Sequence, residues 1–244
     1  MSRRTPRGNT FQPDVYATVL SLLPKDREAQ ILDAGAGEGH FCDLLGRNGY
    51  VNLAACDHDA TQFKVSGVRF RSADLCESLP FDDETFDCVV SIEVVEHIAN
   101  HPRYFAELFR VLRKGGVAIV TTPNIQSLPS RLHFLVHGNT DGARRPLDPA
   151  RESWQQHTHC LGIQQFLYYT SHHGASIETI ATNRMRRSGL LMLPLYPLLF
   201  LLMLSRLRRG RYRERGRLYW RYLRAVLTFP ALVGRILVVV ARKQ

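Results

Sequence analysis

The sequence lacks the cysteine patterns of a disulfide framework or a zinc site. Its five cysteines are an odd number, and no two of them form a Cys-x-x-Cys pair. Such usage predicts reduced, mostly buried thiols in a cytosolic environment. The sequence also has no internal repeat, and its start, "MSRRTPRGNTFQPD", lacks the apolar core of a secretory signal. We therefore expect a cytoplasmic protein that begins with a flexible basic arm.

Acidic residues are almost absent from the last quarter of the chain. Residues 184–244 contain 15 of the 32 Lys and Arg residues but only one acid, Glu214, whereas residues 1–183 carry a slightly negative formal charge. A chain of 244 residues is long enough for one large domain with an elaboration. The charge distribution predicts a mildly acidic domain with a strongly basic appendage.

Short apolar runs alternate with helical patterns along most of the chain. Such alternation indicates an α/β fold with a mostly parallel sheet that is covered on both faces. We expect strands at 29–35, 51–57, 68–74, 117–124, 176–183 and 235–244, and one that opens the segment 86–98. We expect helices at 12–24, 38–50, 101–116 and 162–174, and a short one around 132–137.

A glycine-rich turn joins the first expected strand to the helix after it. The stretch "ILDAGAGEGHF" places four residues there: Asp33, Gly35, Gly37 and Gly39. Glycines let a ligand approach the backbone closely, and a helix N-terminus offers free N–H groups. A dinucleotide fingerprint would need a further glycine where this chain has His40. The pattern instead suits a ligand with an amino acid moiety, although a tight turn without any ligand is the alternative.

Acids also follow the next two expected strands. Asp57 ends the second strand, where its carboxylate can accept hydrogen bonds from two ribose hydroxyls. Asp74 follows the third strand and can accept from an adenine amino group, while Leu75 can pack on the ring. Each acid alone could be a solvated strand-end residue. Together with Asp33, however, they mark the carboxyl edge at which open α/β sheets bind ligands.

These motifs resemble those of the S-adenosylmethionine-dependent methyltransferases with a seven-stranded Rossmann-like fold. The resemblance includes "SADLCESLPFDDETFDCVVSIEVVEHI" and "ELFRVLRKGGVAIVTTPN", and it covers residues 28–183 and the last strand. It implies a three-layer, doubly wound sheet of seven mostly parallel strands with an antiparallel last strand, and S-adenosylmethionine as cofactor. It also implies that Asp33 and the three glycines surround the methionine part, Asp57 holds the ribose, Asp74 and Leu75 contact the adenine, and Ile92 and Glu93 line the cofactor.

The stretch "SIEVVEHI" is similar to the corresponding part of the ubiquinone-biosynthesis O-methyltransferases, small-molecule enzymes that associate with membranes. In that family, Glu and His residues at this spacing can bind a divalent cation. The equivalent residues here are Glu93, Glu96 and His97. Hydrogen bonding within the fold is the commoner role for such an acid–His pair, so we predict no metal site.

Two histidines are candidates for a general base, which a hydroxyl acceptor would need near its attacking oxygen. His157 and His159 alternate in "ESWQQHTHCLG", with Trp154 alongside, just before the helix expected at 162–174. In this fold the region often forms the lid over the acceptor. We expect one of the two to be the catalytic base, with His97 as a competitor and packing against the lid as the alternative.

An apolar and basic segment separates the last two expected strands. Leu190 to Leu204 are all apolar or proline, and an arginine-rich run follows. This stretch is shorter than the ~20 residues needed to cross a bilayer, and Pro194 and Pro197 interrupt it. We expect an element at the membrane interface, with apolar residues in the acyl boundary, arginines on anionic headgroups, and an interfacial set of aromatic residues comprising Tyr212, Tyr219, Trp220 and Tyr222.

The sequence thus predicts a methyltransferase domain formed by residues 1–183 and 235–244, with a helical insertion at 184–234. We expect O-methylation of a membrane-associated or lipid-linked small molecule: a quinone precursor, a lipid or a sugar of an envelope glycolipid. The protein would be cytoplasmic and peripheral on the inner face of the membrane. Three alternatives stay open: a nucleic-acid methyltransferase that uses the arginines, an inactive cofactor-binding protein, and an insertion that packs on the domain or on a second copy.

Overall fold

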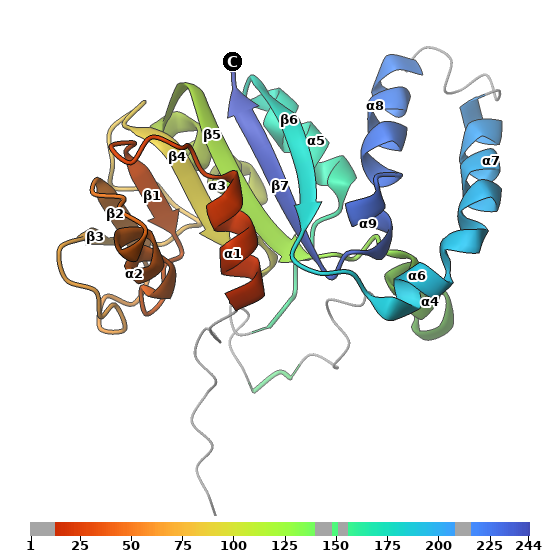
Figure 1. Ribbon diagram of the computed structural model, residues 1–244, viewed down its shortest axis with the longest axis horizontal. Helices are drawn as coiled ribbons and strands as arrows, with labels where there is room; N and C mark the ends of the chain where they lie inside the picture. The colour runs from red at the N-terminus through yellow and green to blue at the C-terminus, as the bar shows by residue number, and fades with distance from the viewer. Residues whose placement is uncertain (1–12, 140–147, 151–155, 208–215) are drawn as a thin grey trace, which may run out of the picture.

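The computed structural model describes residues 13–139, 148–150, 156–207 and 216–244. The predicted basic arm, Trp154 and Tyr212 lie outside the described residues. Figure 1 shows a twisted sheet with helices on both faces, and a group of helices that projects from one edge of this body. The five cysteines are free, and three of them are buried: Cys42, Cys56 and Cys88.

The seven strands of the sheet are β1 Ile31–Ala34, β2 Leu53–Asp57, β3 Arg69–Ser72, β4 Phe86–Ile92, β5 Leu112–Pro123, β6 Ala175–Thr182 and β7 Ile236–Lys243. Their order is β3-β2-β1-β4-β5-β7-β6. The first five strands pair in parallel, whereas β7 runs antiparallel to both of its neighbours, β5 and β6. The predicted fold of seven mostly parallel strands with an antiparallel last strand is confirmed.

The helices that cover the sheet are α1 Pro13–Leu22, α2 His40–Arg47, α3 His101–Val111 and α5 Ile163–His172. Successive strand residues point to opposite faces, so Val238 and Val240 of β7 pack in the apolar layer with α1 and α2. Leu237 and Val239 face the other layer, with α3 and α5. This alternation buries both faces of the central strands, which explains why they are nearly continuous apolar runs in the sequence.

Two of the expected helices differ most from the structure. The helix expected at 101–116 ends at Val111, because Leu112 is already fully buried in β5 opposite Phe86. The short helix expected around 132–137 begins earlier and is α4, Leu128–His137. The Ser127 side chain accepts a hydrogen bond from the Ser130 backbone N–H and so caps this helix one turn before its apolar pattern is recognisable.

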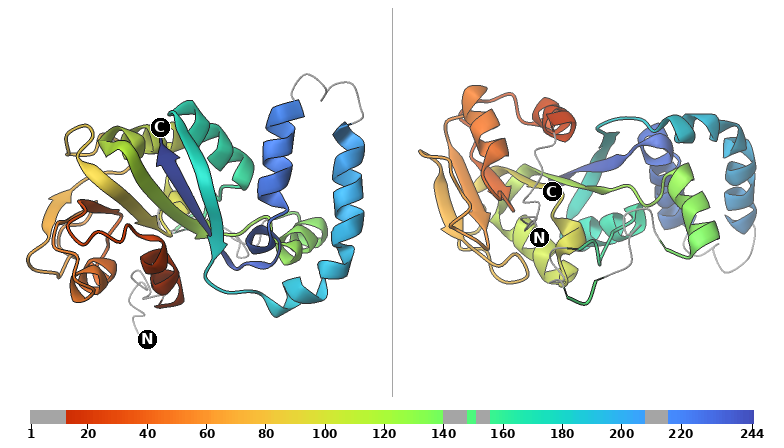
Figure 2. Two further views of the ribbon diagram at one scale, coloured as in Figure 1. Left: turned by 45° about the horizontal axis from the view of Figure 1, so that its top comes forward. Right: turned by 90° about the horizontal axis from the view of Figure 1, so that it is seen from below.

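The chain between β6 and β7 contains α6 Arg187–Leu191, the 3-10 turn η4 Leu193–Leu195, α7 Tyr196–Leu207, α8 Gly216–Val226 and α9 Phe229–Val233. α9 is anchored to the sheet, because the Asn124 side-chain amide after β5 donates to the carbonyl groups of Ala231 and Gly234 at 3.0 and 3.1 Å. α7 and α8 stand side by side farther out (Figure 1 and Figure 2), and the Tyr219 hydroxyl donates to the Met203 carbonyl. None of the described helices is long and apolar enough to span a membrane.

Candidate active site

The turn between β1 and α2 requires glycine at two positions. Gly35 has a positive φ of 94°, and a Cβ atom there would lie 2.4 Å from Cγ2 of Val94. Gly39 has a φ of 88°, and its Cβ would lie 2.6 Å from Cγ2 of Val65. The backbone of the turn therefore lies close to the side chains of Val94 and Val65, and a larger residue at either glycine would displace the turn.

The Asp33 carboxyl is buried beneath this turn, near the carboxyl end of β1. Only 2% of the residue is exposed, and the Cys42 thiol donates a long 3.5 Å hydrogen bond to its Oδ2. Burial raises the pKa of Asp33 to about 7, an effect that the nearby Asp57 charge reinforces. The site thus holds a carboxyl group whose charge becomes stable when a cationic partner arrives.

Asp57 is the last residue of β2 and its carboxylate reaches back to the same turn. Its Oδ2 accepts a 2.8 Å hydrogen bond from the backbone N–H of Gly37, and its Oδ1 lies 2.8 Å from Nδ1 of His58. The side chain is only 14% exposed. The structure therefore brings the two acids and the glycine turn together, as the sequence predicted.

The other predicted cofactor residues lie at the carboxyl ends of β3 and β4. Asp74 is exposed, with Oδ1 accepting from the Cys76 backbone N–H, while Leu75 is buried. Ile92 ends β4, and Glu93 follows with a positive φ of 56°, which is uncommon for a residue other than glycine. Sequence reasoning missed Thr121 of β5, whose hydroxyl accepts from the Glu93 N–H and donates to Glu93 Oε1, so fixing this strained residue.

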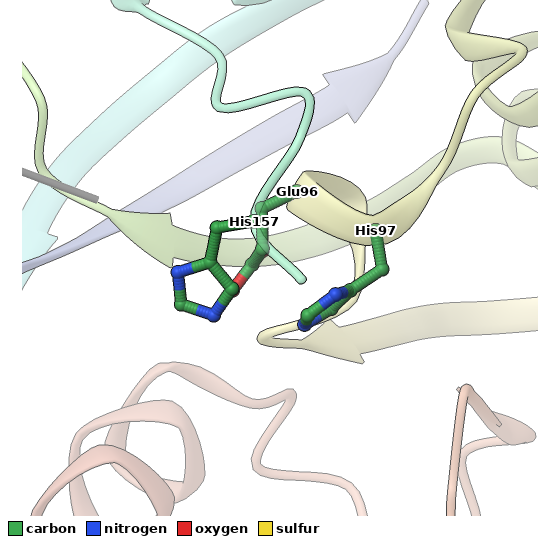
Figure 3. Close-up of side chains that lie close together, drawn as sticks. All are labelled: Glu96, His97 and His157. Atoms are coloured by element: carbon green, nitrogen blue, oxygen red, sulfur yellow. The ribbon is translucent and has the colours of Figure 1, made fainter. Parts of the chain in front are cut away.

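A cluster of three titratable side chains lies beside the end of β4 (Figure 3). Glu96 and His97 come from the 3-10 turn η1, Val95–His97, and His157 comes from the segment before α5. One ligand atom from each side chain lies within 4.8 Å of the others. The two histidine rings meet edge to face with centroids 4.9 Å apart, and burial together with His157 lowers the pKa of His97 to about 4.

Glu96 is fully buried, and neither carboxyl oxygen has a hydrogen-bond partner among the described residues. Burial and the Glu93 charge raise the pKa of Glu96. A divalent cation fits this donor set, because it would satisfy the unpartnered carboxyl oxygens with two imidazoles beside them. The structure groups Glu96 and His97 with His157, whereas Glu93 hydrogen-bonds to Thr121. The absence of a metal site stays a prediction.

The two candidate bases occupy different surroundings. His157 takes part in the cluster, whereas His159 is exposed and its Nδ1 lies 2.7 Å from the Thr158 hydroxyl. The backbone N–H of His159 donates to the Glu96 carbonyl, so this residue ties its segment to η1 through its main chain. Of the two side chains, that of His157 is the one grouped with Glu96 and His97 beside the end of β4.

Comparisons with known proteins find similarity to methyltransferases. Residues 32–120 match a family described as "Methyltransferase domain". The chain is 38% identical over 98 residues to a probable S-adenosylmethionine-dependent methyltransferase of Mycolicibacterium smegmatis, a match that covers 38% of each protein. It is 27% identical over 164 residues to the mitochondrial ubiquinone biosynthesis O-methyltransferase of Rattus norvegicus, covering 62% of this chain and 46% of that protein. It thus spans less than half the length of these relatives.

A solved structure shows that the fold is shared along nearly the whole chain. The S-adenosylmethionine-dependent methyltransferase from Mesorhizobium loti superimposes with a TM-score of 0.57, covering 94% of this chain and 98% of that one. The sequence identity is 16%, so this likeness concerns the fold.

Proposed function

We propose that this chain, which carries a methyltransferase domain over residues 32–120 and is homologous to S-adenosylmethionine-dependent methyltransferases, transfers a methyl group to a hydroxyl of a small acceptor. The observation that carries the proposal is the pair of carboxyl groups, Asp33 and Asp57, placed around a turn that only glycine can form. S-adenosylmethionine supplies an electrophilic methyl group on a sulfonium when bound. Calorimetric titration with S-adenosylmethionine tests the assignment, and the absence of binding would contradict it.

The residues of the chain would hold the donor along the carboxyl edge of the sheet. Asp33 would meet the ammonium group, Asp57 the ribose hydroxyls, and Asp74 with Leu75 the adenine. Ile92 and Glu93 would line the middle of the site. Because methyl transfer is an in-line displacement, the main contribution of such an arrangement is to align donor and acceptor.

His157 would accept the proton of the acceptor hydroxyl. Its neighbour His97 has a pKa lowered to about 4 and is therefore neutral near pH 7, so it does not repel a proton arriving on His157. If a divalent cation binds here, Glu96, His97 and His157 would hold it, and it would polarise the acceptor oxygen.

Affinity for S-adenosylhomocysteine, the demethylated donor, should fall about tenfold between pH 8 and pH 6. Because the pKa of Asp33 is raised to about 7 in the free protein, a proton competes with the ammonium group of the ligand as the pH decreases through 7. In the absence of ligand, the stability of the fold depends on pH in the opposite direction. Because burial disfavours the ionised carboxyl, the contribution of Asp33 to the free energy of unfolding decreases as the pH rises through 7. Calorimetry across this range measures the first effect.

Asp33→Asn is the matched control, since a carboxamide of similar shape has no proton to lose. This variant should bind the ligand more weakly at pH 8 and show no such dependence on pH. An affinity of the wild-type protein that is level between pH 8 and pH 6 would contradict the role of Asp33.

We further propose that residues 184–234 form an insertion that docks the domain on the inner face of a membrane, where the acceptor is membrane-associated or lipid-linked. One side of α7 packs inward through residues such as Leu199, whereas its outer side exposes Leu198, Leu201 and Leu202. Leu195 of η4 is exposed as well. Leu191, at the end of α6, is 82% exposed and extends this apolar surface. Arginines follow α7, which would place cations at the headgroups.

Flotation with anionic liposomes tests the docking. The variant Leu198→Asn/Leu201→Asn/Leu202→Asn leaves the inner face of α7 intact, and we expect it to bind liposomes about 100-fold more weakly, since each leucine contributes about 1 kcal/mol on burial in the acyl boundary. Val51→Asn, at an exposed apolar residue on the far part of the domain, is the control. Recovery of the wild-type protein in the lipid-free fraction would contradict docking, and steeply salt-dependent RNA binding would favour a nucleic-acid acceptor.

A further inference from the structure

A cavity of about 300 Å³ lies between α4 and α8, just beyond the carboxyl end of β5. Its lining consists of Ile125, Gln126, Arg131, Phe134 and Tyr222. β5 ends at Pro123, three residues before Gln126, so this lining begins within about 10 Å of the sheet edge. The Gln126 side chain is itself fixed, because its Oε1 accepts a 2.6 Å hydrogen bond from the Ile163 backbone N–H at the start of α5.

Arg131 is the cation of this cavity, and the part of the chain that the structure describes offers it no acidic partner. Its Nε donates a 2.8 Å hydrogen bond to the Gln126 carbonyl, which fixes the plane of the guanidinium group. Among the described residues its two terminal nitrogens have no hydrogen-bond partner. Burial lowers the pKa of Arg131, and the nearby Tyr222 has the opposite effect. An arginine stays protonated even so, and a half-buried charge of this kind normally has a counter-ion.

Arg110, by comparison, is an arginine whose charge is balanced by two acidic partners. Its guanidinium group binds the Glu107 carboxylate at 2.7 Å and Asp83 at 2.6 Å. By contrast, neither α4 nor α8 contains an acid, and α8 carries three further arginines: Arg217, Arg221 and Arg224. Among the described residues, the walls of the cavity thus carry positive charge alone, so an anionic ligand can supply the counter-ion.

We propose that this cavity binds an anionic group of the acceptor, a carboxylate or a phosphate ester, through the two terminal nitrogens of Arg131. The planar guanidinium group presents two parallel N–H donors that match such an anion. Phe134, Ile125 and the Tyr222 ring cover the apolar remainder of the molecule, and the volume suits a group about the size of one aromatic ring. This inference rests on the proposed function, because it assigns the group to a methyl acceptor.

Small aromatic anions test the site on the full chain saturated with S-adenosylhomocysteine. We expect saturable binding of benzoate or phenyl phosphate by NMR titration, and no binding of the neutral benzyl alcohol. Arg131→Gln should weaken binding of the anion about 10- to 100-fold, and Arg131→Lys should restore part of it, because a lysine keeps the charge but not the paired donors. Arg224→Gln, at an exposed arginine of α8, should change binding less than threefold.

Parallel calorimetry with S-adenosylhomocysteine separates this inference from the proposed function. Arg131→Gln should bind that ligand as the wild-type protein does, so lost anion binding with intact cofactor binding supports the cavity. If the Gln variant does not fold, Phe134→Asp, at a half-exposed residue, should abolish anion binding by repulsion. The assignment would be overturned if the wild-type protein did not bind the anions, or if Arg131→Gln bound them equally well. Binding that is confined to anionic vesicles would also overturn it, because it would place the anion on a lipid headgroup.

Discussion

Asp57→Ala should lower the affinity for S-adenosylhomocysteine about 100- to 10,000-fold while the protein stays folded. The substitution removes a carboxylate that accepts from two ribose hydroxyls, and with it two charge-assisted hydrogen bonds, each worth about 1.5–3 kcal/mol. The substitution also removes the acceptor of the Gly37 N–H, which faces the same side chain at 2.8 Å. Isothermal titration calorimetry measures the loss, and thermal unfolding verifies the fold.

Two variants separate ribose binding from support of the turn. Asp57→Asn keeps an oxygen for the Gly37 N–H but loses the charge, so it should recover only part of the affinity. Asp59→Ala is the matched control, because this exposed acid hydrogen-bonds within its own loop, to Thr61 and Gln62. Full affinity in Asp57→Asn would reduce the role of Asp57 to supporting the turn.

His157→Ala should lower kcat about 100- to 10,000-fold and leave the affinity for S-adenosylhomocysteine unchanged, because the loss of a general base affects proton transfer rather than donor binding. Transfer of a tritiated methyl group into fractionated lipids and small molecules measures the rate and also identifies the acceptor. His159→Ala is the matched control on the same segment, and its exposed ring should contribute less than fivefold.

Metal dependence decides between two roles for the same side chain. If the protein loses activity in a chelator and regains it with a divalent cation, Glu96, His97 and His157 act as ligands, and the role of His157 as base is wrong. Activity that is insensitive to the chelator would exclude these three side chains as metal ligands and favour the role of His157 as base. Equal losses in His157→Ala and His159→Ala would point to a structural role for the segment.

Local patterns determined the predictions that succeeded. The carboxyl ends of parallel strands meet at one edge, so Asp33, Asp57 and Asp74 could be placed at that edge from the sequence, whereas their contacts with a cofactor stay a prediction. β7 was recognisable as a late apolar run, and its antiparallel direction followed from the family resemblance. The boundaries of α3 and α4 were missed because a buried pairing partner, Phe86, and a serine cap decide them.

Only the tertiary structure decided the contacts between segments that are far apart in the chain. The sequence alone determined the sheet, the glycine turn and the acids beside it, because strand alternation and turn chemistry act over a few residues. It could not pair Glu96 with His157, 61 positions later, or seat Thr121 against Glu93. The sequence also could not show that Arg131 lies in one cavity with Tyr222 and has no acid beside it among the described residues, since the surroundings of a charge depend on how α4 and α8 pack. Burial sets the protonation and the binding capacity of such groups, and burial exists only in the folded chain.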